Sequence, residues 1–111
     1  MAVELPAGAS FEGSVVIDIG GRVGALVVYT DAAVAGLEIE VTPTDGAGPP
    51  THTAVRERRL PRGTRFAAVF PALPAGSYRL PPIGSAPGRD VTVGPGRVTE
   101  VHLNPKEAVH A

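Results

Sequence analysis

The sequence predicts an all-β fold, an antiparallel β-sandwich of about seven to eight short strands. Three observations carry this prediction. Short apolar runs alternate with polar residues at the period of a half-buried strand. The 111 residues include 14 glycines and 12 prolines, which suit many tight turns. No segment keeps a helical period, and the length fits one domain with a single core.

The first strands are expected in the N-terminal third of the chain. Residues 1–13 form an irregular lead-in, with an added edge strand at 3–5 as one interpretation. Residues 14–19 are rich in β-branched side chains and predict a strand. The glycine pair at 20–21 predicts a hairpin to the next run, residues 24–30. That run is apolar on both faces, so we expect it in the middle of a sheet.

The cleanest alternation follows a connection at residues 31–36 that holds a single helical turn. Residues 37–41 predict a strand with Glu38 and Glu40 facing water. The residues expected to face the core are Leu37, Ile39 and Val41. A loop of Pro, Gly, Asp and Thr then fills residues 43–50.

One strand is predicted over residues 52–60, with an arginine-rich outer face, and a turn over 61–64. A second central strand is predicted over 65–70. Pro71 and Pro74 each lack a backbone donor, so neither is expected in a central strand. Gly76 can take a positive φ at the corner that follows.

The last part of the chain continues the same pattern. Tyr78 and Leu80 alternate with polar neighbours, which predicts another strand. After a loop at 81–88, residues 90–93 and 97–103 predict a closing hairpin across 94–96. We therefore expect one sandwich domain over residues 14–103 and a frayed tail over 104–111.

Two motifs carry a resemblance. They read Phe-Pro-Ala-Leu-Pro-Ala-Gly-Ser-Tyr-Arg-Leu at 70–80 and Val-Thr-Val-Gly-Pro-Gly-Arg-Val-Thr-Glu-Val-His-Leu at 91–103. Together they resemble the second half of the carboxypeptidase regulatory-like and Cna-B-like sandwiches. The resemblance covers residues 23–103 and implies a prealbumin-like or Ig-like fold without implying a function. Tyr78, placed after Leu73 and Gly76, resembles a tyrosine corner, in which the phenol bonds back to the backbone.

The chemistries of that group do not carry over to this chain. An isopeptide bond in Cna-B-like domains needs a lysine on a first strand, whereas the single lysine here is Lys106, two residues from Asn104. Hydroxyisourate hydrolases of the prealbumin-like group end in Tyr-Arg-Gly-Ser, and this chain ends in Lys-Glu-Ala-Val-His-Ala. The whole chain also resembles short bacterial proteins labelled phospholipase, although no residue pattern supports that activity.

A hydrolase is the alternative from another functional class. A nucleophile elbow needs Gly-x-Ser-x-Gly, whereas Ser14, Ser77 and Ser85 each follow a glycine directly. A triad assembled in space stays open at this point, and turn serines with surface histidines are the favoured interpretation. Its candidate members are Ser77 or Ser85, His52 or His102, and Asp18 or Asp90.

Metal binding has weak candidates. His102 and Glu100 point to the same side of one strand, but protein zinc sites use three or four ligands. We therefore expect no metal and no cofactor.

The strongest local signal is a cluster of five arginines within ten residues: Arg56, Arg58, Arg59, Arg62 and Arg65. Three uses are considered in order of preference. Arg56 and Arg58 pair across strands with Glu38 and Glu40; the cluster docks an acidic protein; or it binds phosphate of lipid or nucleic acid. Few aromatic residues are available for base stacking, so no nucleic-acid partner is expected.

The predicted function is a non-catalytic accessory or protein-interaction module whose arginine-rich face meets an acidic partner. The alternatives are a hydrolase and a phosphate- or metal-binding regulator, and an unpaired sheet edge offers a route to a homo-oligomer. The chain has no cysteine, no apolar run long enough to span a bilayer, and an acidic N-terminus. These features predict a cytoplasmic protein without a transmembrane segment.

Overall fold

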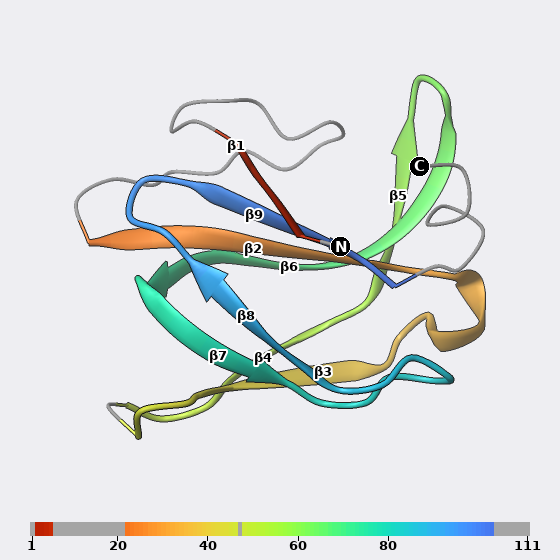
Figure 1. Cartoon of the computed structure of the whole chain (residues 1–111). Helices are drawn as coiled ribbons and strands as arrows, with labels where there is room; N and C mark the ends of the chain where they lie inside the picture. The colour runs from red at the N-terminus through yellow and green to blue at the C-terminus, as the bar shows by residue number, and fades with distance from the viewer. Residues whose placement is uncertain (1, 6–21, 47, 104–111) are drawn as a thin grey trace.

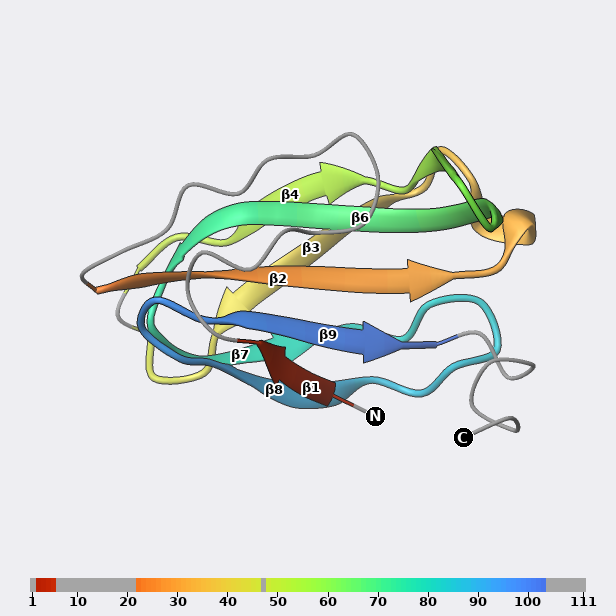
Figure 2. The same ribbon diagram turned by 90° about the horizontal axis from the view of Figure 1, so that it is seen from above.

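The chain forms an all-β sandwich, as predicted. The structure, a computed structural model, describes residues 2–5, 22–46 and 48–103. Strands β2 to β9 make two four-stranded sheets packed face to face, and β1 extends one of them (Figures 1 and 2). The elements are β1 (Ala2–Leu5), β2 (Val23–Thr30), the 3₁₀ turn η1 (Ala32–Val34), β3 (Glu38–Pro43), β4 (Thr51–Ala54), β5 (Arg56–Leu60), β6 (Gly63–Pro74), β7 (Gly76–Leu80), β8 (Arg89–Val93) and β9 (Val98–His102).

The larger sheet has the order β1-β9-β2-β6-β5, so β2 is the central strand that its two apolar faces predict. Strand β1 pairs with β9 at the edge of this sheet, in agreement with the added edge strand expected at residues 3–5. Strand β2 pairs with β6 on one side and with β9 on the other. The predicted strand at 14–19, the glycine pair and the tail at 104–111 lie outside the described residues.

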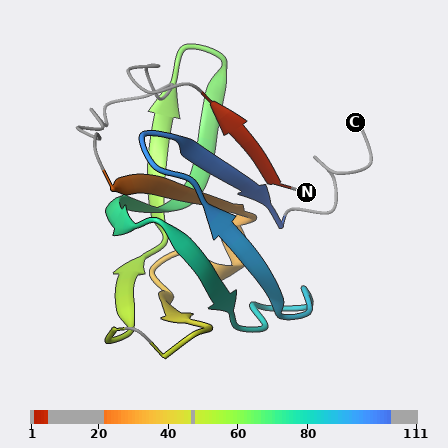
Figure 3. The same ribbon diagram turned by 60° about the vertical axis from the view of Figure 1, so that its left-hand side comes forward.

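The sheets are not purely antiparallel, because β9 runs parallel to β2. The predicted closing hairpin of residues 90–93 and 97–103 is wrong, because the two strands belong to different sheets. Strand β8 pairs with β7 in the smaller sheet, whose order is β4-β3-β7-β8, while β9 belongs to the larger one. The glycine-rich link at 94–96 therefore carries the chain from one sheet to the other, as Figure 3 shows.

The main core lies between the sheets. Leu26 and Val28 of β2 and Phe70 of β6 pack with buried residues of the smaller sheet. From that sheet the core receives Ile39, Val41, Tyr78, Leu80, Val91 and Val93. The alternation predicted for Ile39, Val41, Tyr78 and Leu80 is therefore confirmed.

A second buried cluster occupies the outer face of the larger sheet. Its members are Ala25, Val27, Tyr29, Ala67, Val69 and Val98. Because successive side chains of a strand point to opposite faces, these residues alternate with those of the main core. This face also carries the candidate site described below.

Two strands replace the single one predicted over residues 52–60. Strand β4 pairs with β3 in the smaller sheet, and β5 pairs with β6 in the larger one. Val55 lies between them and is buried. Its backbone N–H donates to Leu37 O and its carbonyl accepts from Gly36 N, both at 2.8 Å, which fixes the point where the chain changes sheets.

Leu37 does not face the core, contrary to the prediction. Strand β3 begins at Glu38, and the Leu37 side chain is 42% exposed. The connection before it holds the predicted single turn, η1, in which Asp31 Oδ1 accepts from Ala33 N at 3.0 Å. The described part of the chain contains no helix long and apolar enough to cross a membrane.

Pro71 and Pro74 lie within β6, an interior strand, which the sequence did not predict. Two features accommodate them. The register with β2 shifts between Gly24 and Leu26, opposite this part of β6. Strand β5 pairs with residues 63–67 of β6 only. After Ala67, that edge of β6 has no β5 partner, so a proline there removes no hydrogen bond to β5.

Candidate functional site

The hairpin of β5 and β6 positions the arginine cluster. In its antiparallel register Arg58 lies opposite Arg65, and Arg56 lies opposite Ala67. These three arginines therefore share the outer face of the larger sheet. Arg59 lies on the other face, opposite Thr64, and Arg62 lies in the turn between the strands. We call these five arginines, with the strands that carry them, the arginine hairpin.

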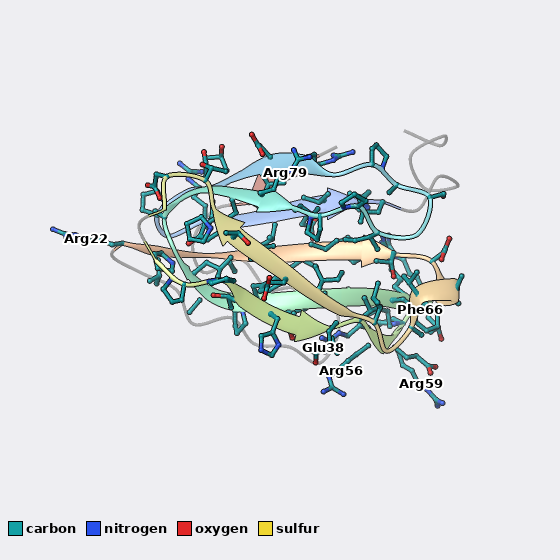
Figure 4. All side chains as sticks on the ribbon, turned by 90° about the horizontal axis from the view of Figure 1, so that it is seen from below. Arg22, Glu38, Arg56, Arg59, Phe66 and Arg79 are labelled. Carbon is teal, nitrogen blue, oxygen red and sulfur yellow. The ribbon has the colours of Figure 1, made fainter. Side chains whose placement is uncertain are left out.

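The hairpin projects beyond the rest of the sandwich in Figures 1 and 3. Arg56, Arg59 and Arg62 are exposed, and Figure 4 shows Arg56 and Arg59 pointing away from the body of the molecule. The side chain of Arg59 is 87% exposed, with its Nε 3.6 Å from Glu57 Oε2. Such an exposed pair contributes little to stability and leaves the guanidinium accessible.

The predicted pairing of the arginines with the β3 glutamates is not formed. Strand β5 belongs to the other sheet, and no ion pair among the described residues joins Arg56 or Arg58 to Glu38 or Glu40. Instead, Glu38 Oε1 lies 2.7 Å from His52 Nδ1 on β4. The structural use that the sequence favoured first is therefore wrong, because the chain changes sheets before the arginines begin.

Arg58 has an unfavourable electrostatic environment. Burial, and secondly the charge of Arg56, lower the pKa of Arg58 below its usual value. Within the described part of the chain, its Nε is buried and has no hydrogen-bond partner. Like charges placed directly opposite each other on a sheet are destabilising, and Arg58 faces Arg65 in this way. An anion bound at this face would reduce that repulsion.

An aromatic and ionic group lies beside the arginines on the same face. The guanidinium carbon of Arg65 is 4.2 Å from the ring centroid of Tyr29, a cation–π contact. Tyr29 also stacks on His102, with centroids 4.7 Å apart and planes at 16°. Its hydroxyl donates to Glu100 Oε2 at 3.0 Å.

Sequence reasoning did not identify Tyr29 as part of a site. It meets His102 because β2 and β9 pair in parallel, with Tyr29 and His102 in register. No local pattern signals a parallel pair between strands about seventy residues apart, so only the tertiary structure could reveal it.

His102 and Glu100, the weak metal candidates, do lie together, with Nε2 and Oε1 4.0 Å apart. The Tyr29 hydroxyl already donates to the same carboxylate. Among the described residues, no group of three or more His, Cys, Asp or Glu side chains could hold a metal ion. The pair therefore supplies two ligands, fewer than a protein zinc site uses.

The triad candidates lie apart in the structure. His52 is on β4 beside Glu38, and His102 is on β9 in the other sheet. Ser77 lies on β7, opposite Thr92, and Ser85 lies in the loop after β7. Within residues 22–46 and 48–103, no hydrogen bond joins a serine hydroxyl to a histidine. Asp18 lies outside the described residues.

The Tyr78 corner has the geometry of a structural element. The Tyr78 hydroxyl donates to Pro74 O at 2.5 Å, the back-bond that a tyrosine corner implies. Leu73 is buried in the main core, and Gly76 has a φ of 153°, which favours glycine. Burial, and secondly Asp45, raise the pKa of Tyr78 above its usual value.

A cleft of about 300 Å³ lies next to this corner, at the opposite end of β6 from the hairpin turn. Its walls include Pro43, Pro49, Pro74 and Tyr78. The Tyr78 hydroxyl that lines this cleft already donates to Pro74 O, so it serves the corner.

Comparisons with protein-family models, with curated proteins and with solved structures find no match for this chain.

Proposed function

We propose that this protein is a non-catalytic interaction module whose arginine hairpin binds an acidic surface of a partner protein. The observation that carries the proposal is the placement of Arg56, Arg58 and Arg65 on one sheet face, with Arg58 directly opposite Arg65. Arg59 and Arg62 add exposed positive charge on the other face and at the turn. A carboxylate-bearing partner offers the counter-charges for this surface.

The hairpin is a suitable docking element because of its position. Edge strand β5 is exposed or half-buried at every residue, and the hairpin projects from the sandwich (Figure 3). Guanidinium groups bind carboxylates through two parallel hydrogen bonds, which gives geometric specificity as well as charge attraction. An acidic protein surface can therefore engage several arginines at once.

A nucleic acid is a less suitable ligand for the hairpin. Proteins that bind single strands stack successive bases on exposed aromatic side chains. Here the aromatic residue on this face, Tyr29, is buried and stacked between Arg65 and His102. The net charge of the whole chain is −1, which does not provide the broad positive field that phosphate backbones require.

For the fold family, we propose a sandwich of the carboxypeptidase regulatory-like and Cna-B-like kind. The back-bond of Tyr78 and the buried Leu73 support this assignment. The division of β8 and β9 between two sheets departs from the closing hairpin of the resemblance.

A matched pair of charge-reversal variants tests the function. The first is Arg56→Glu with Arg59→Glu, and the control is Arg22→Glu with Arg97→Glu, which changes the net charge equally at exposed positions outside the hairpin. We expect an acidic peptide of glutamate and threonine to bind the wild type and the control alike, and the hairpin variant at least about tenfold more weakly. Equal binding by all three proteins contradicts the proposal.

A pull-down from the source cell then identifies the partner. The same two double variants serve as bait beside the wild type. An acidic protein retained by the wild type and the control, and lost with the hairpin variant, is the expected result.

A further inference from the structure

Strand β5 ends its sheet and has a free side for pairing within the described structure. In the order β1-β9-β2-β6-β5 it pairs only with β6. In an antiparallel ladder alternate residues direct their N–H and C=O groups to opposite sides. Strand β5 therefore presents backbone donors and acceptors on its outer edge, the arrangement onto which an extended segment can add as a further strand.

The side chains of β5 define what such a segment must carry. Arg56 and Arg58 are two residues apart on the same face, a spacing of about 6.6 Å along a strand. A neighbouring strand places its own alternate side chains about 4.5–5.5 Å from them. Glutamate or aspartate at alternate positions would thus face both arginines in register.

The other edges do not combine these features. Among the edge strands whose side chains the structure describes, β8 carries Arg89 and Asp90, so its charge is balanced. Edge strand β4 has the sequence Thr-His-Thr-Ala, and its His52 is paired with Glu38. Strand β5 carries three arginines and one glutamate in five residues. Both charged residues on its outer face, Arg56 and Arg58, are arginines, so β5 is the described edge with a strong preference for acid.

We propose that the outer edge of β5 accepts an extended segment of the partner as an additional β-strand, with acidic residues at alternate positions facing Arg56 and Arg58. This proposal rests on the proposed function, since it names how the acidic partner is held. A second copy is a poorer occupant, because pairing β5 with itself sets arginine against arginine on the outer face, where Arg56 and Arg58 lie. The arginines that disfavour pairing of β5 with itself therefore favour an acidic strand at the same edge.

The test uses two synthetic peptides of alternating glutamate and threonine with capped ends. One has an ordinary backbone. The other is N-methylated at every residue, so it keeps all its carboxylates and has no backbone donor. Binding of each to the full chain is measured by fluorescence anisotropy, and amide exchange of β5 is followed by NMR. We expect the N-methylated peptide to bind about tenfold more weakly or worse, because the inter-strand hydrogen bonds are lost. We also expect the ordinary peptide to slow the exchange of β5 amides.

The outcomes separate this inference from the proposed function. If both peptides bind equally and binding depends on Arg56 and Arg59, the acidic partner site stands and strand addition is overturned. If neither peptide binds, both proposals fail. If the chain alone forms a dimer whose β5 amides are already protected, the edge belongs to a second copy and the proposal is overturned.

Discussion

Arg58 of β5 lies directly opposite Arg65 of β6, so two guanidinium side chains occupy one cross-strand pair. Cross-strand pairs of like charge are destabilising, and the pKa of Arg58 is lowered by burial and by Arg56. Arg65 is held over the Tyr29 ring on the same face. Two arginines in one cross-strand pair, on a projecting hairpin, are consistent with a surface arranged for an anionic ligand.

The first prediction concerns this pair. Arg58→Glu should raise the free energy of unfolding by about 0.2–1 kcal/mol, because it replaces a like-charge pair with an opposite-charge pair. The same change should weaken binding of the acidic peptide. Urea unfolding and fluorescence anisotropy measure the two effects. Arg59→Glu is the control: Arg59 faces Thr64 and lies near Glu57, so no stabilisation is expected there. A loss of stability in Arg58→Glu would show that the arginine pair is not repulsive.

The second prediction concerns salt. Binding of the acidic peptide should weaken steadily as sodium chloride rises, because the Debye length falls from about 10 Å at 0.1 M to about 3 Å at 1 M. The salt dependence should be smaller in the variant with Arg56→Glu and Arg59→Glu, and unchanged in the control with Arg22→Glu and Arg97→Glu. Affinity that does not depend on salt in the wild type argues against charge recognition.

The third prediction concerns the Tyr78 corner. Tyr78→Phe removes the hydrogen bond to Pro74 O and should lower the free energy of unfolding by about 1 kcal/mol. Thr44→Val is the control, because it removes an exposed bond to Ser77 O that is longer, 3.4 Å. Urea denaturation of both variants gives the comparison. Equal, small losses would mean that the corner bond does not stabilise the fold.

The fourth prediction concerns alkaline pH. Burial raises the pKa of Tyr78 in the folded state, with Asp45 as the second cause. The folded chain thus holds this proton more tightly than the unfolded chain. The stabilisation is fully present below the unfolded pKa of about 10 and is lost as pH rises from there through the folded pKa.

The measurement uses the Tyr29→Phe variant, in which Tyr78 is the single tyrosine left of two. The phenolate absorbance of the native protein should titrate above about pH 10, and that of the urea-unfolded chain near the ordinary value. A native midpoint at or below the unfolded one would overturn this prediction.

The fifth prediction concerns Gly24, where the backbones of two segments approach closely. A Cβ at this position would lie 2.2 Å from Gly94 O and 2.8 Å from Arg97 O. Gly24→Ala should therefore destabilise the protein by about 1–3 kcal/mol, since backbone must shift to make room. Gly48→Ala, with nothing within 4 Å of the added Cβ, is the control and should be nearly neutral. Thermal unfolding of both variants tests this difference.

The sequence alone determined the layered β architecture and much of its detail. Alternation placed Ile39 and Val41 inside with Glu38 and Glu40 outside, and the structure agrees. The two apolar faces of residues 24–30 predicted the central strand β2. This strand contributes residues to one buried cluster on each of its faces. These features follow from period-two patterning, which is a local property of the chain.

Only the tertiary structure decided which strands are neighbours. It divided β4 from β5 at Val55 and β8 from β9 at residues 94–96, and thereby removed the arginines from the β3 glutamates and joined Tyr29 to His102. An apolar alternation states which face of a strand is buried, but both sheets of a sandwich offer the same kind of buried face. Sheet membership therefore depends on long-range packing between segments, which no local pattern in the sequence encodes.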